Sequence, residues 1–106
     1  MFRIYCMGLT IREGRELATY LESKHGVSEV LLDHDLTDMQ TRCHFDLLVH
    51  LAEGGIRAIR AGDTQKNIYK AVKGWMGRFS NKGVVAVEVK LYGPDGKFVE
   101  KITKTR

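Results

Sequence analysis

Residues 2–21 read FRIYCMGLTIREGRELATYL, and part-way along them the spacing of the apolar side chains changes from two residues to three or four. At the start, Phe2, Ile4 and Cys6 alternate with other side chains, as on a strand that buries one face. We therefore expect a strand over residues 2–9. Because a helical pattern follows it directly, this stretch indicates a fold that mixes strands and helices.

The helix after this strand has a recognisable start and end. Thr10 and Glu13 have the spacing of a capping box, in which the two side chains satisfy exposed backbone N–H groups reciprocally. The helix is expected to run to about Lys24, and Gly26 suits the left-handed conformation that ends helices. Its inward side chains are expected to be Leu17, Tyr20 and Leu21.

The rest of the chain predicts more strands and one more helix. Alternating apolar residues and Gly-rich turns predict strands over residues 27–32, 45–51, 56–61, 84–91 and 97–102. Gly54-Gly55 is expected to turn a hairpin between the second and third of these. Asp63 or Thr64 can cap the second helix, which is expected to run to roughly Asn81.

The expected fold class is α+β. Its first six elements, in the order β-α-β-β-β-α, would form a two-layer sandwich: a four-stranded sheet with two helices on one face. The other face of the sheet would be left to water or to a partner. Residues 1–83 would form this domain, and residues 84–106 would add a C-terminal β-hairpin. A length of 106 residues with 43% apolar residues is enough for one small core.

Charge is distributed unevenly along the chain. Residues 1–53 hold five of the 17 basic residues and nine of the 13 acidic ones, whereas residues 54–106 hold twelve and four. Such an asymmetry says more about partners than about fold. It favours a polyanion, and we expect a nucleic acid, as the partner of the basic half.

Most of the bases in the middle of the chain fall on the second predicted helix. The expected RNA contacts there and in the preceding hairpin are Arg57, Arg60, Lys66, Lys70, Lys73, Arg78 and Lys82. The spacing of Lys66, Lys70 and Lys73 places them on one helix face, and an apolar stripe that includes Trp75 and Phe79 forms another. A lysine-rich helix that merely faces water is the alternative. Because Trp75 and Phe79 belong to the apolar stripe, Tyr69 and Tyr92 are the better candidates for stacking on bases.

Other classes of function have weaker signals. Asp33, His34, Asp35, Asp38, His44 and Asp46 form the one group that could bind a metal or act in acid–base catalysis, but their spacing fits neither role well. We expect no metal, no cofactor and no enzymatic activity. Cys6 and Cys43 are expected to be reduced and buried, and with no leader or membrane span in the sequence the expected location is the cytoplasm.

Several strings, taken in order, resemble the ribosome hibernation-promoting factor family, also called ribosomal subunit interface or sigma-54 modulation proteins. These are Leu9-Thr10-Ile11, the Gly54-Gly55 hairpin, Ala61-Gly62-Asp63 and the stretch Asn67-Ile68-Tyr69-Lys70-Ala71-Val72. The resemblance covers residues 2–83. It implies a protein, not an enzyme, that binds the small ribosomal subunit where messenger and transfer RNAs would lie, and so represses translation under stress.

The same resemblance implies contacts between ribosomal RNA and basic residues on both helices. Lys24 matches a basic position late in the first helix, and Arg78 matches the basic position after Trp75-Met76. The next basic position falls on Asn81, with Lys82 beside it. The terminal hairpin has no counterpart in short members, and we expect a monomer or a weak dimer. The alternative function is a protein-binding module or inhibitor that docks through the sheet edge or that hairpin.

Overall fold

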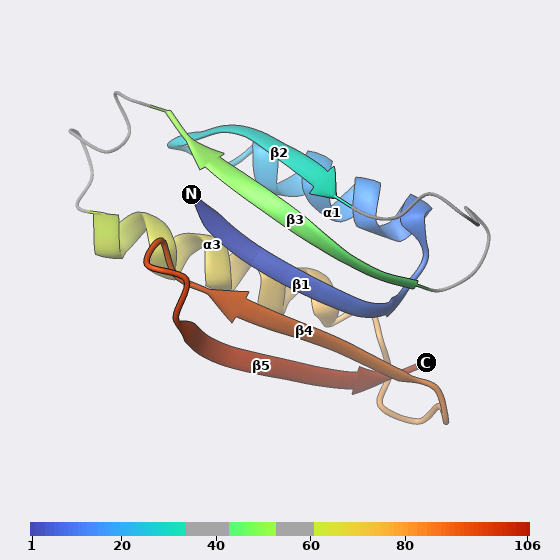
Figure 1. Ribbon diagram of the computed structural model, residues 1–106. Helices are drawn as coiled ribbons and strands as arrows, with labels where there is room; N and C mark the ends of the chain where they lie inside the picture. Colours follow the sequence, from blue (N-terminus) through green and yellow to red (C-terminus); the bar gives the residue numbers. More distant parts are fainter. Residues whose placement is uncertain (34–42, 53–60) are drawn as a thin grey trace.

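The computed structural model describes residues 1–33, 43–52 and 61–106, and these form an antiparallel sheet of five strands with two helices (Figure 1). The strands are β1 (Phe2–Leu9), β2 (Val27–Asp33), β3 (Cys43–Leu51), β4 (Ala86–Tyr92) and β5 (Phe98–Thr105). The helices are α1 (Ile11–Glu22) and α3 (Ala61–Met76). The α+β class is therefore confirmed.

The strand order is β2-β3-β1-β4-β5, and each neighbouring pair is antiparallel. The units β1-α1-β2 and β3-α3-β4 each leave room for one strand between their own two strands. Each unit fills the gap in the other, because β3 lies between β1 and β2, and β1 lies between β3 and β4. This interleaving is the split β-α-β arrangement of ferredoxin-like folds, extended here by β5 at one edge.

The terminal hairpin is part of this sheet, which differs from the expected extension. β4 pairs with the central strand β1, with Ile4 opposite Leu91 and Cys6 opposite Val89. Val87, Val89 and Leu91 are completely buried. The alternation that we used to predict a separate hairpin thus marks a strand that buries one face in the common core.

The turn of the hairpin expected across Gly54-Gly55 lies outside the described residues, and the pairing of β3 is observed with other strands. That strand pairs with β1 along one side and with β2 along the other. The predicted strand over residues 56–61 lies outside the described residues apart from Ala61, which is the first residue of α3. The helix therefore begins earlier than the caps Asp63 or Thr64 predicted.

Both helices lie behind the same face of the sheet (Figure 1), as expected, and the core fills the space between the two layers. Ile68, Val72 and Met76 of α3 are buried against the inward side chains of the sheet, and Trp75 and Phe79 are buried with them. Cys6 is a free thiol in this core, and burial, followed by the charge of Asp46, raises its pKa far above the ordinary range. The side chain of Cys43 lies outside the described part.

The exposure of two tyrosines differs from the prediction. Tyr20, expected inward, is 38% exposed on the outer side of α1. Tyr69, expected to be free for stacking, is only 7% exposed, and its ring contacts the edge of Phe2. The spacing of apolar residues on a helix does not predict the exposure of a residue at the border of the buried stripe, because that exposure depends on which strands pack nearby.

The ends of the helices follow local chemistry only in part. The predicted capping box is confirmed: the Glu13 N–H donates to Thr10 Oγ1 at 3.1 Å, and the Thr10 N–H donates to Glu13 Oε1 at 2.9 Å. Helix α3 ends at Met76, five residues before the predicted end at Asn81. There the Gly77 N–H donates to the Gly74 carbonyl at 3.2 Å, which begins a tighter turn. Two glycines in this last turn weaken the helix enough to end it.

The capping box is joined to the other end of the chain. Glu13 Oε1 also accepts a hydrogen bond from the Arg106 guanidinium, which lies 5.2 Å from the centre of the Phe79 ring. Burial alone would raise the pKa of Glu13, but the bonds from Arg106 and Thr10 outweigh burial and lower the pKa below its ordinary value. The ionised carboxylate therefore stabilises the fold.

We expect Glu13→Gln to lower the free energy of unfolding by about 1 kcal/mol near neutral pH, the typical cost of weakening a helix cap. Because the folded pKa of Glu13 is lowered, its contribution is complete above the ordinary carboxyl range and is lost as the pH falls through the folded pKa. Thermal unfolding across acidic pH measures this, and the gap between wild type and variant should close at low pH. Glu16→Gln, one turn away on the exposed side, is the control and should change little. A gap that stays constant with pH would contradict the assignment.

Candidate nucleic-acid interface

The lysines of α3 are exposed, and two of them have no ion pair within the described part of the chain. Lys66, Lys70 and Lys73 all lie on the solvent side of the helix, as their spacing predicts. Within the described part of the chain, Lys66 and Lys70 have no carboxylate at ion-pairing distance. Their exposed position suits contact with an external anion.

The other two strong candidates are already paired inside the molecule. Lys73 Nζ lies 2.8 Å from Glu100 Oε1 on β5, and Arg78 Nη1 lies 2.8 Å from Glu16 Oε2 on α1. The sequence prediction treated both as free cations. It could not anticipate these pairs, since each joins residues that the chain fold alone brings together.

The remaining candidates are divided between other parts of the molecule. Lys24 lies just after α1, with its ammonium 4.3 Å from the centre of the Tyr20 ring. Lys82 is exposed in the segment between α3 and β4. Arg57 and Arg60 lie outside the described residues. The structure therefore brings only part of the predicted set to one surface.

A groove between the two helices adds cations that we did not predict. Its volume is about 730 Å³, and it is lined by Arg12, Arg15, Glu16, Thr19, Tyr20, Trp75 and Arg78. Arg12 and Arg15 are exposed and one turn apart on α1. The signal that would have identified them is their position on the polar side of the amphipathic first helix. The predicted contacts came from the basic half of the chain and, for Lys24, from the family resemblance, and neither pointed to Arg12 or Arg15.

Three guanidinium groups thus surround one concave surface. Arg78 lies over the Trp75 ring, 4.3 Å from its centre, and is held from the other side by Glu16. Arginine presents several N–H donors in a planar fork, which suits phosphate oxygens better than a lysine does. Because Trp75 is only 8% exposed, the groove offers charge and shape rather than an open ring for base stacking.

The acidic and histidine residues of the candidate metal or catalytic cluster are partly brought together on the sheet. In the strand register, Asp33 of β2 lies opposite Asp46 of β3. His44 Nδ1 forms a hydrogen bond with the Tyr5 hydroxyl. Burial, opposed by Arg3 and supported by Asp33, raises the pKa of Asp46. In the described part of the chain, no three His, Cys, Asp or Glu residues could hold a metal ion together. His34, Asp35 and Asp38 lie outside that part.

Comparisons with known proteins do not identify relatives of this chain: no family model, no curated protein and no solved structure matches it. Among the described residues, no helix has the length and apolar character needed to cross a membrane.

Proposed function

We propose that this chain binds structured RNA through the outer surface of its two helices, which we call the helix layer. The surface consists of Lys66 and Lys70 on α3 together with the arginines of the groove, Arg12, Arg15 and Arg78. The observation that carries this proposal is the groove itself, where Arg12 and Arg15 of α1 and Arg78, just after α3, surround one concavity. Phosphates in a folded RNA require such charges at fixed positions, but no particular base sequence.

The rigidity of this surface supports RNA binding rather than a loosely solvated face. Arg12 and Arg15 lie on α1, which packs on the core, and Arg78, two residues after α3, contacts both Trp75 and Glu16. Side chains that are already ordered lose less conformational entropy on binding than mobile ones do. The ion pair to Glu16 lowers the net charge of the groove, but the two remaining arginines outnumber the acids that line it.

The proposed target is the ribosomal RNA of the small ribosomal subunit. This choice depends on the resemblance of residues 2–83 to the ribosome hibernation-promoting factors. A rigid basic domain in the decoding channel would exclude messenger and transfer RNAs by its volume. It would thereby repress translation without any chemical step.

A ribosome pelleting assay at several salt concentrations tests the proposal. If about five basic residues neutralise phosphates, the logarithm of the binding constant should fall against the logarithm of the salt concentration with a slope of roughly −3 to −4. An excess of messenger RNA bound to the subunits should compete with the protein for the channel. A slope near zero, or no pelleting at low salt, would remove the helix layer as an RNA-binding surface.

Protein docking along the sheet edge is the second candidate function, and exposed side chains on β5 favour it. Phe98 and Val99 are exposed at the start of this edge strand. However, Lys101 and Lys104 follow on the same strand, and lysines on an edge strand oppose the addition of a further strand. RNA binding therefore remains the leading proposal.

A further inference from the structure

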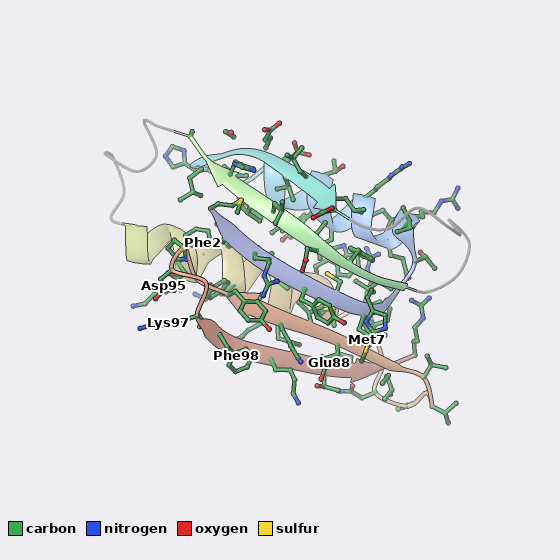
Figure 2. The ribbon with its side chains drawn as sticks, in the orientation of Figure 1. Phe2, Met7, Glu88, Asp95, Lys97 and Phe98 are labelled. Carbon is green, nitrogen blue, oxygen red and sulfur yellow. The ribbon has the colours of Figure 1, made fainter. Side chains whose placement is uncertain are left out.

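The face of the sheet that the helices do not cover carries aromatic and basic side chains in alternation. This face is turned toward the viewer in Figures 1 and 2, and Phe98 is labelled in Figure 2. The strand register places Arg3 of β1 opposite Tyr92 of β4, and Tyr5 of β1 opposite Lys90 of β4. Each aromatic ring therefore has a cation directly across from it and another ring diagonally across from it.

The contacts between these side chains follow that register. The Arg3 guanidinium lies 4.1 Å from the centre of the Tyr92 ring, and Lys90 Nζ lies 5.8 Å from the centre of the Tyr5 ring. Phe98 on β5 meets Tyr92 edge to face, with ring centres 5.9 Å apart, and is itself 55% exposed. The two tyrosine rings are partly exposed. This group is called the aromatic face and consists of Arg3, Tyr5, Lys90, Tyr92, Phe98 and Lys101.

Charge divides the uncovered side of the sheet into two halves. On β1, β4 and β5 the outward ionisable groups are Arg3, Lys90, Lys101 and one acid, Glu88, which lies 3.4 Å from Lys101. On β2 and β3 the outward carboxylates are those of Glu29, Asp33 and Asp46. The aromatic residues are thus concentrated on the basic half, and that half suits an anionic partner.

We propose that the aromatic face binds a short single-stranded nucleic acid, with unpaired bases stacked on Tyr5, on Phe98 and on the guanidinium of Arg3. Single strands are recognised by aromatic platforms and arginine planes flanked by positive charge, and a well-known example is an antiparallel sheet with aromatic residues on its central strands. Here β1 is the central strand of the sheet. The binding surface is opposite the helix layer, so the inference goes beyond the proposed function and does not depend on it.

The geometry supports stacking in two ways. Diagonal neighbours on an antiparallel pair lie about 7–8 Å apart, a span that successive bases of an extended strand can cover. Arg3 lies against the Tyr92 ring and its Nη1 lies 3.9 Å from Asp46 Oδ2, so the guanidinium is held in place at the surface, where 44% of the side chain is exposed. Because cations alternate with the rings, the phosphates of the same strand would have partners at Lys90 and Lys101.

The test is fluorescence anisotropy of a labelled ten-nucleotide oligouridine with the full chain, in wild type and in the double variant Tyr5→Leu with Phe98→Leu. Leucine keeps an apolar side chain but removes the aromatic ring. Loss of stacking at two positions should weaken binding by roughly tenfold to several hundredfold. Leu31→Ala, an exposed apolar residue on the acidic half of the same side of the sheet, is the control and should leave oligouridine binding unchanged. Thermal unfolding shows that each variant remains folded.

Three results would overturn the inference. The first is no binding of oligouridine by wild-type protein at low salt. The second is equal affinity in wild type and the double variant, which would place the single strand elsewhere. The third is concentration-dependent self-association that the double variant abolishes, because the face would then be occupied by a second copy. Ribosome pelleting by the double variant should stay at the wild-type level, so failure here is distinguishable from failure of the proposed function.

Discussion

Replacing Lys66 and Lys70 together with glutamate should weaken ribosome binding by at least about 100-fold and should flatten its salt dependence by about two units of slope, one for each lost phosphate contact. The effect is large because each substitution removes an attraction and introduces a repulsion toward phosphate. Pelleting at several salt concentrations measures both quantities. Stability should change little, because each lysine is exposed and has no ion-pair partner in the described part of the chain.

The choice of residues follows from the structure. Reversing Lys73 or Arg78 would place a new carboxylate beside Glu100 or Glu16, so a loss of binding could reflect local repulsion inside the protein. The matched control is Lys90→Glu with Lys97→Glu, which makes the same change of charge away from the helix layer, at two lysines that have no ion pair within the described residues. If the control abolishes pelleting while the α3 variant retains it, the ribosome contacts the sheet and not the helix layer.

The largest effect on stability is expected from Gly8→Ala. Gly8 has a φ of +85°, and a Cβ atom there would lie 2.2 Å from the backbone carbonyl oxygen of Ala86. That carbonyl lies at the start of β4 and cannot retreat without disturbing the pairing of β4 with the central strand β1. We expect a loss of at least about 3 kcal/mol in the free energy of unfolding, since strain from positive φ adds to the clash. In a domain of this size that loss lowers the melting temperature by roughly 12 °C or more.

Gly96→Ala is the control that separates the two contributions. Gly96 has a similar φ of +80°, but nothing lies within 4 Å of the position of its missing Cβ atom. This variant should therefore lose only about 1 kcal/mol, the cost of the backbone conformation alone. Thermal or denaturant unfolding of both variants measures the difference. Equal losses would mean that β4 adjusts freely at Ala86 and that the close approach is unimportant.

The elements that the sequence predicted well are those specified by near neighbours. The alternation of Phe2, Ile4 and Cys6 identified β1, and the spacing of Thr10 and Glu13 identified the start of α1. Both patterns depend on interactions within a few residues, so they can be recognised without knowledge of the fold. The same reasoning located the buried side of α3 at Trp75 and predicted the burial of Phe79, which lies just after the helix.

Pairing between strands was predicted less well. The neighbours of β3 are β1 and β2, and nothing in the alternation of β3 itself indicates either of them. Residues 84–92 were read as part of an appendage, although β4 is a neighbour of the central strand. Alternating apolar and polar residues indicate that a strand has one buried face, but they do not indicate which strand lies beside it.

For the candidate interface, the sequence by itself determined that the second half of the chain is basic and that the lysines of α3 share one face. Only the tertiary structure decided which of these charges form ion pairs with acidic residues of the same chain. Glu16 and Arg78 are 62 residues apart in sequence, yet they form an ion pair, and Arg12 and Arg15 border the groove beside them. Helical spacing places a charge on a surface, but the packing of two helices against one sheet determines which opposite charges meet it.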